Sequence, residues 1–136
     1  MTQFRGDYCY ELNSEDKFDL EIAIMRSRSF GGTMVMWKST LDKYVTVIPS
    51  TSSSFLPIVV SPPGCPVSVH IAIYLPTSGK ESNFMEQLIL LDNCIDELTE
   101  KYVDVPIFIH GDANVNPNNT ERTVLFNCFL SKFNLA

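Results

Sequence analysis

The sequence predicts a single α+β domain, and three observations support this fold class. Hydrophobic residues make up 45% of the 136 residues, enough for one packed core but not for two ordinary domains. Short β-prone runs bounded by Gly, Pro, Ser and Thr fill the first half of the chain, and a long amphipathic helical pattern follows them. That helix lies between two apolar strand-like runs, an order typical of a parallel crossover unit.

The N-terminal 17 residues show no hydrophobic period. They are polar and mixed in charge, so we interpret residues 1–17 as a linker, a frayed end or the remnant of an element, and residues 18–136 as the domain. Alternating apolar and acidic side chains predict a strand over residues 18–24. Residues 33–37 predict a second strand, and the Gly31-Gly32 pair between them indicates a hairpin.

The middle of the chain predicts three more strands and a helix. The strands fall at residues 44–48, 55–60 and 67–74, separated by a Ser/Thr loop and a Pro-Pro-Gly turn. A helix is expected from about residue 81 to residue 102, with capping-box spacing between Ser78 and Glu81. Its apolar side chains recur every three or four residues on one face, at Phe84, Leu88, Leu91, Ile95, Leu98 and Tyr102.

The C-terminal third predicts a short apolar strand at residues 106–109, ending at Gly111, and a second helix at residues 122–133. Because a long helix separates this strand from the one ending at Tyr74, we expect the two strands to be parallel neighbours. Ligand sites collect outside the carboxyl ends of such strands. Tyr74 and the turn at residues 111–114 should therefore lie side by side.

The turn Gly111-Asp112-Ala113-Asn114 brings together two groups that can do chemistry. Asp112 and Asn114 are two residues apart, so in an extended turn they project to the same side. The carboxylate can accept a proton from water or hold a metal-bound water, and the amide can donate to a phosphate oxygen. An Asx turn explains the same residues equally well. His70 and His110 are expected to be hydrogen-bonded, half-buried residues rather than catalysts.

Three segments, in this order, resemble the endonuclease/exonuclease/phosphatase superfamily, especially the endonuclease domains of non-LTR retrotransposons. They are GGTMVMW at residues 31–37, IYLPT at residues 73–77 and IFIHGDANV at residues 107–115. The resemblance covers roughly residues 27–136. It implies a DNase I-like four-layer α/β/β/α sandwich that hydrolyses phosphodiesters, with DNA or another phosphodiester as substrate and a divalent metal, usually Mg²⁺, as cofactor.

The resemblance also implies residue roles. Tyr74 would hydrogen-bond the scissile phosphate or stabilise its charge, Asp112 would orient or deprotonate the attacking water, and Asn114 would bind phosphate and steady Asp112. Without the resemblance, we would interpret Tyr74 as an aromatic residue at a strand end with a solvated hydroxyl. The catalytic set expected for this chain is therefore Tyr74, Asp112 and Asn114.

Two motifs of the family do not occur in this sequence. Members carry an upstream Gln-Glu motif, whose glutamate binds the metal, and a downstream Ser-Asp-His motif. We therefore expect a domain truncated at both ends, inactive alone, with weak or no Mg²⁺ binding because Asp112 would contact the ion at most through water. Exposed sheet edges would then favour a protein partner or missing chain segments as their cover.

Net charge and cysteine spacing limit the possible ligands and the cellular compartment of the protein. The net charge of −6 opposes a polyanion on average, so any phosphodiester contact must be local. The four cysteines, 29 to 56 residues apart, lack the close pairs of zinc sites and indicate free thiols. The sequence shows no signal peptide pattern and no long apolar stretch for a membrane, so we expect an intracellular protein, nuclear or cytoplasmic.

Two other functions remain open at the level of sequence. The chain could retain the fold as a non-catalytic module that binds a protein or a nucleic acid. It could also be a phosphatase for small phosphate esters of the phosphoinositide type, which would share the same core. Substrate choice depends on loops, and the sequence alone does not show which substrate these loops would accept.

Overall fold

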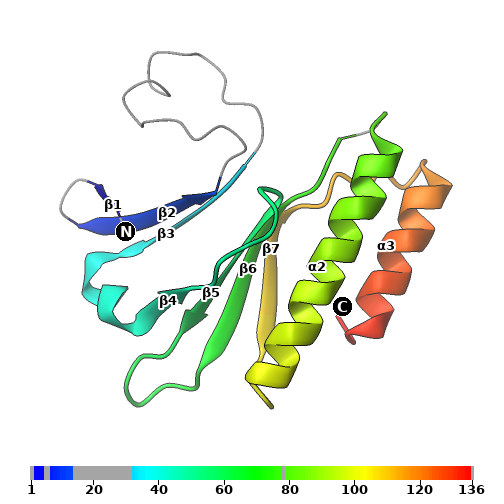
Figure 1. Ribbon diagram of the computed structural model, residues 1–136. Helices are drawn as coiled ribbons and strands as arrows, with labels where there is room; N and C mark the ends of the chain where they lie inside the picture. Colours follow the sequence, from blue (N-terminus) through cyan, green and yellow to red (C-terminus); the bar gives the residue numbers. More distant parts are fainter. Residues whose placement is uncertain (1, 5–6, 14–31, 78, 136) are drawn as a thin grey trace, which may run out of the picture.

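The computed structural model describes residues 2–4, 7–13, 32–77 and 79–135, which form two β-sheets and three helices. The first sheet has the order β1-β2-β3 and the second the order β4-β5-β6-β7. Two long helices, α2 and α3, cover one face of the second sheet (Figure 1). The chain is therefore of the mixed α+β class. The strands are β1 Thr2–Phe4, β2 Tyr8–Asn13, β3 Thr33–Lys38, β4 Val45–Val47, β5 Phe55–Val60, β6 Ser68–Tyr74 and β7 Ile107–Asp112; the helices are the 3-10 helix η1 Ser39–Tyr44, α2 Glu81–Lys101 and α3 Thr120–Lys132.

The second sheet contains the strands that position the candidate site. β4, β5 and β6 are antiparallel neighbours, and β7 pairs with β6 in parallel, with α2 as the connection. The predicted crossover is thus confirmed. Along β6 every second side chain is buried against the helices, and the intervening ones face the other way. In the described part of the chain β7 is one edge strand of this sheet, and β4 is the other.

The core lies between the second sheet and α2. The expected helical stripe is confirmed, since Phe84, Leu88, Leu91, Ile95 and Leu98 are all buried. They pack with the inward side chains of β5 and β6 and with one phenylalanine of α3, a set that includes Phe55, Val69, Ile71, Ile73 and Phe129. Burial of this many large apolar side chains, at about 1.5–3 kcal/mol each, is the main stabilising contribution. None of the helices described combines the length and apolarity needed to span a bilayer.

Three sequence expectations need correction or lie outside the described residues. The strand predicted at residues 18–24 and its hairpin to β3 fall on residues 14–31, which the structure does not describe. The capping box is wrong in its geometry: α2 begins after Lys80, so Glu81 is its first residue rather than its third. The Glu81 carboxylate accepts a hydrogen bond from the Gly79 N–H instead, at 3.2 Å.

The N-terminal segment contains two strands that the sequence did not indicate, β1 and β2, which pair with each other. β2 pairs with β3 along its whole length, with Cys9 opposite Trp37. Cys9 and Tyr10 are adjacent and both buried, so the alternation that marks a strand with one wet face is missing here. Although residues 1–17 are polar in composition, they include two paired strands.

Burial makes one cysteine a poor nucleophile. Cys94 is half-buried on α2, and desolvation, reinforced by the nearby Glu97 carboxylate, raises the pKa of its thiol to about 11. At pH 8 roughly one molecule in a thousand would then carry the thiolate that reacts. We expect iodoacetamide to modify the exposed Cys65 and Cys128 first. Cys94 should react about 100-fold more slowly than a free model thiol, as measured by mass spectrometry; alkylation at the rate of Cys65 would contradict this assignment.

Candidate functional site

The candidate site lies at the carboxyl ends of β6 and β7. Tyr74 and Asp112 are partners in the parallel register, each at the last residue of its strand. Both side chains are exposed, Tyr74 to 43%, while the preceding Ile73 is buried. Residues paired across neighbouring strands project to the same face of the sheet. The prediction that Tyr74 lies beside the 111–114 turn is confirmed.

Asn114 joins the two loops that leave these strands. Its backbone N–H donates to Asp112 Oδ1 at 2.8 Å, and its side-chain Nδ2 donates to the Leu75 carbonyl at 2.7 Å. The Leu75 N–H in turn donates to the Asp112 carbonyl at 3.0 Å. The Asx turn considered as an alternative is thus present, and Asn114 adopts the left-handed backbone conformation, with φ 51°. Asn114 steadies Asp112 through its backbone, whereas its amide holds the neighbouring loop.

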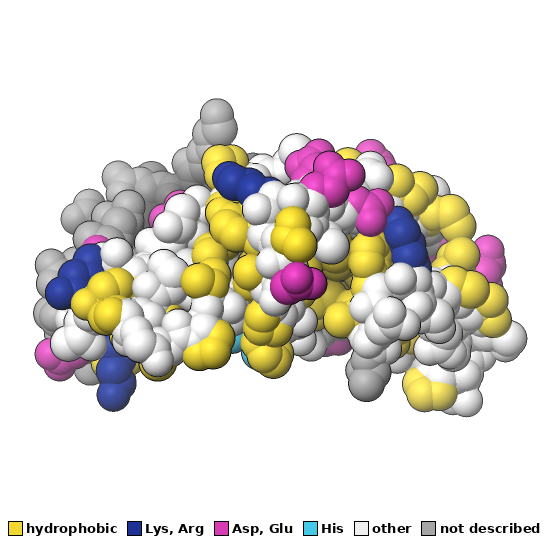
Figure 2. Space-filling model, turned by 90° about the horizontal axis from the view of Figure 1, so that it is seen from below, with side chains coloured by type: hydrophobic (Ala, Val, Ile, Leu, Met, Phe, Trp, Pro, Cys, Tyr) yellow, Lys and Arg dark blue, Asp and Glu magenta, His cyan; other side chains and the backbone are white. Residues whose placement is uncertain are grey.

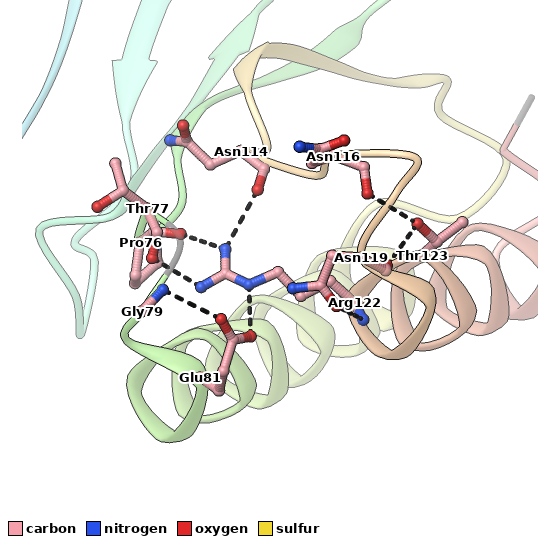
Figure 3. Close-up of polar contacts among 9 residues, drawn as sticks. All are labelled: Pro76, Thr77, Gly79, Glu81, Asn114, Asn116, Asn119, Arg122 and Thr123. Carbon is pink, nitrogen blue, oxygen red and sulfur yellow. Dashed lines mark hydrogen bonds and ion pairs between the residues drawn. The ribbon is translucent and has the colours of Figure 1, made fainter.

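Arg122, in the first turn of α3, is the residue of this region that sequence reasoning missed. Its side chain is fully buried and reaches between the loops after β6 and β7 (Figure 3). It donates from Nη1 to the carbonyls of Pro76 at 2.6 Å and Asn114 at 3.2 Å, and from Nη2 to the carbonyl of Thr77 at 2.7 Å. One guanidinium therefore fixes three backbone carbonyls from two loops.

The charge of Arg122 is compensated by a carboxylate and an aromatic ring. Its Nε donates to Glu81 Oε2 at 2.6 Å, and its guanidinium carbon lies 4.2 Å from the centre of the Phe84 ring. The hydrogen bond from Arg122 holds the pKa of the Glu81 carboxyl below its usual value. With its donors directed at these partners, Arg122 fixes the loops and is not positioned as a phosphate ligand.

A pattern in the sequence could have revealed Arg122. It falls at the start of the stripe of α3 that faces the core, spaced at helical intervals from Phe126, Phe129 and Phe133. A charged residue at such a position needs a buried counter-charge or several acceptors. The apolar residues of this stretch alone predict the helix but not the role of Arg122.

The two histidines lie on the same sheet face as Tyr74 and Asp112. His70 Nδ1 and His110 Nε2 are 3.0 Å apart, and His70 Nε2 is 3.0 Å from Ser68 Oγ. The expectation of hydrogen-bonded histidines is confirmed for both. Partial burial is correct for His70 but wrong for His110, which is exposed because β7 is an edge strand in the described part of the chain. Desolvation, together with His110, lowers the pKa of His70.

The described residues do not fit a resident magnesium site. Within residues 2–4, 7–13, 32–77 and 79–135, no three His, Cys, Asp or Glu side chains lie close enough to hold a metal ion. Mg²⁺ favours octahedral coordination by oxygen atoms, for which the candidate site offers the Asp112 carboxylate and nearby amide and carbonyl groups. We therefore assign no Mg²⁺ ligands at the candidate site and derive no reaction step through Mg²⁺.

A cavity of about 480 Å³ lies at the other end of the sheet. It is lined by the last turns of α2 and α3 and the start of β7, chiefly by apolar side chains such as Ile95, Ile107 and Phe133. Figure 2 views the molecule from below and shows hydrophobic side chains exposed on that face, with acidic ones around them. Tyr74 and Asp112 lie at the opposite, carboxyl ends of the strands, so this cavity is not part of the candidate site.

The geometry thus places Tyr74, Asp112 and Asn114 at one rim, supported from beneath by Arg122. Comparison with known proteins gives no family assignment: no family model matches the chain, and no curated protein or solved structure is significantly similar to it.

Proposed function

We propose that this chain carries the phosphate-contacting and water-orienting part of a phosphodiesterase site of the endonuclease/exonuclease/phosphatase type, acting on nucleic-acid phosphodiesters. The supporting observation is the pairing of Tyr74 with Asp112 at the carboxyl ends of neighbouring parallel strands. The proposal includes a DNase I-like sandwich, in which the β1-β2-β3 sheet forms the second β layer. Mg²⁺ is the expected cofactor, with most of its ligands supplied by groups other than those described.

The proposed chemistry assigns one task to each side chain. The exposed hydroxyl of Tyr74 donates to a non-bridging phosphate oxygen and so stabilises the charge that grows in the transition state. Because Asp112 Oδ1 accepts the Asn114 N–H, Oδ2 is the oxygen that receives the proton of the attacking water. The water oxygen bonds to phosphorus, the P–O ester bond breaks, and the leaving alkoxide takes a proton from solvent.

This chain alone is not expected to hydrolyse its substrate. The described residues provide one carboxylate at the rim and no group of three or more His, Cys, Asp or Glu side chains that could hold a metal ion. Loss of members of a catalytic set costs several orders of magnitude in rate. A non-catalytic binding module is the second candidate, favoured by the Asx turn that already engages one oxygen of Asp112.

Binding measurements test the site without requiring turnover. The anisotropy of a fluorescent duplex oligonucleotide in low salt with Mg²⁺ would report binding. Tyr74→Phe removes one hydrogen bond to phosphate and should weaken binding about 3- to 10-fold. Asp112→Asn keeps the Asx acceptor but removes a negative charge near the phosphate, so binding should strengthen about 2- to 5-fold.

Matched controls separate the site from general surface effects. Tyr8→Phe changes an equally exposed tyrosine on β2, and Asp104→Asn removes an exposed charge in the turn before β7. Both controls should bind as the unsubstituted chain does. If Asp104→Asn strengthens binding as much as Asp112→Asn, or Tyr74→Phe has no effect, the proposed site is wrong.

A plasmid-nicking assay tests the expected inactivity. With Mg²⁺ and supercoiled plasmid, we expect no nicking by this chain or by Asp112→Ala. Nicking that Asp112→Ala abolishes would contradict the expected inactivity and exclude the non-catalytic module, while supporting Asp112 as the proton acceptor.

A further inference from the structure

Three aromatic rings form a cluster on the face of β6 and β7 that lies opposite α2. In the register His70 is the partner of Phe108, and Ala72 is the partner of His110. The ring centroids of His70 and Phe108 are 5.1 Å apart, and those of the two histidines 5.3 Å. The imidazole planes differ by only 11°. The strands and the stacking with Phe108 therefore fix both imidazoles in one arrangement before any ligand binds.

The spacing of two ring nitrogens in this cluster suits a metal ion. His70 Nδ1 and His110 Nε2 are 3.0 Å apart. Two nitrogens each about 2.1 Å from a common ion and 3.0 Å from each other subtend an angle of about 90° at that ion. This is the angle between neighbouring ligands in square-planar or octahedral coordination. A small rotation of the exposed His110 ring would widen it toward a tetrahedral angle.

A serine completes the support of His70. Ser68 Oγ lies 3.0 Å from His70 Nε2. When Nε2 carries the proton it donates to this hydroxyl, and the Nδ1 lone pair accepts the hydrogen bond from His110 Nε2–H. An ion bound by both nitrogens would replace that proton, which moves to Nδ1 of His110. Histidine ligands in metal sites usually have their second nitrogen bonded in this way, and loss of such a partner typically weakens metal binding 10- to 100-fold.

We propose that His70 and His110 form a two-histidine site for a divalent ion of the Ni²⁺, Cu²⁺ and Zn²⁺ group. His70 binds through Nδ1 and His110 through Nε2, both as neutral imidazoles, so the proton of His110 resides on Nδ1. Among the residues described, no third His, Cys, Asp or Glu joins them, so water or an exogenous ligand takes the remaining positions. The site is accessible, since His110 is exposed and Phe108 is 46% exposed.

This site is independent of the phosphodiesterase proposal. Mg²⁺ prefers oxygen ligands, whereas imidazole suits the later transition metals. The two histidines contact each other and Ser68 rather than Asp112 or Asn114 in the structure. A failure of oligonucleotide binding and a failure of metal binding are consequently separate results.

Nitrogen-15 spectra of the histidine rings during a Zn²⁺ titration test the proposal directly. The sequence contains two histidines, so the signals assign readily once any histidine tag is removed. Because exposed thiols also bind zinc, Cys65 and Cys128 are replaced by serine in all samples. We expect His70 Nδ1 and His110 Nε2 to shift together and to reach an endpoint at one equivalent. Mg²⁺ should leave both rings unchanged.

Substitutions then measure the contribution of each group. His70→Asn and His110→Asn should each lower the affinity for Zn²⁺ and Ni²⁺ at least about 10-fold, and Ser68→Ala about 10-fold. Backbone spectra report whether each variant stays folded. If a variant does not fold, the Zn²⁺ titration of the ring nitrogens in the chain with both histidines decides whether the site exists. Unchanged ring nitrogens at saturating Zn²⁺, or full affinity in both asparagine variants, would overturn the site.

Discussion

Replacing Arg122 by methionine should lower the free energy of unfolding by about 3–5 kcal/mol. Methionine fills much of the same space but leaves the carbonyls of Pro76, Thr77 and Asn114 without the donors that now satisfy them. These three hydrogen bonds are partly buried, so each carbonyl left without its donor should cost toward the lower end of about 1–3 kcal/mol. Glu81, at 45% exposure, can instead be solvated, so the backbone carbonyls account for most of the loss.

Urea denaturation followed by circular dichroism measures this effect. Lys132→Met is the control, because it removes a second charge of α3 that pairs with Asp92 and Asp96 on the exposed surface, where ion pairs contribute little. Arg122→Lys keeps a positive charge near Glu81 but lacks the planar group that reaches three carbonyls, so it should recover only part of the stability. If Arg122→Met is no less stable than Lys132→Met, the carbonyl network does not hold the loops.

The parts of the fold that the sequence predicted are those specified by local patterns. The stripe from Phe84 to Leu98 repeats at the helical period, and β6 is a run of β-prone residues bounded by turn residues, so both elements were predicted from local sequence. The pairing of Tyr74 with Asp112 followed from one topological rule, that strands joined by a long helix are parallel. That rule needs no side-chain contacts.

The parts that were missed depend on contacts between distant residues. β2 has adjacent buried residues at Cys9 and Tyr10, so its burial follows no alternating pattern, and the strand is defined by its pairing with β3. Arg122 meets acceptors 8 to 46 positions away in sequence. The histidine pair forms only because β6 and β7 align residues 40 positions apart. Such contacts arise from the tertiary register, which sequence periodicity does not encode.

The two loops of the candidate site are held by elements on both sides. Arg122 secures them from the helix side, and the exchange of hydrogen bonds between Leu75, Asp112 and Asn114 secures them at the rim. Gly111, the residue before Asp112, is the register partner of Ile73 on β6. Its backbone has φ 132°, a conformation that residues with a side chain rarely adopt. The position of Asp112 next to Tyr74 thus depends on a glycine at residue 111.

Gly111→Ala should therefore cost about 3–5 kcal/mol of unfolding free energy and displace Asp112 from Tyr74. A Cβ added at Gly111 would lie 2.0 Å from the carbonyl oxygen of Ile73, its partner on β6, so the strands would have to separate where the site lies. Denaturation measures the stability. The backbone amide signals of Tyr74 and Asp112 would report the displacement.

Gly64→Ala is the control for backbone strain without a clash. Gly64 also has a positive φ, of 74°, but a Cβ there meets no atom within 4 Å, so its replacement should cost only about 1 kcal/mol. The difference between the two variants measures the close contact between β6 and β7. If the two variants lose equal stability, backbone strain alone explains Gly111, and the contact with Ile73 does not constrain the residue at this position. If the amide signals of Tyr74 and Asp112 do not shift in Gly111→Ala, Arg122 and Asn114 position these two residues, and Gly111 is not required for it.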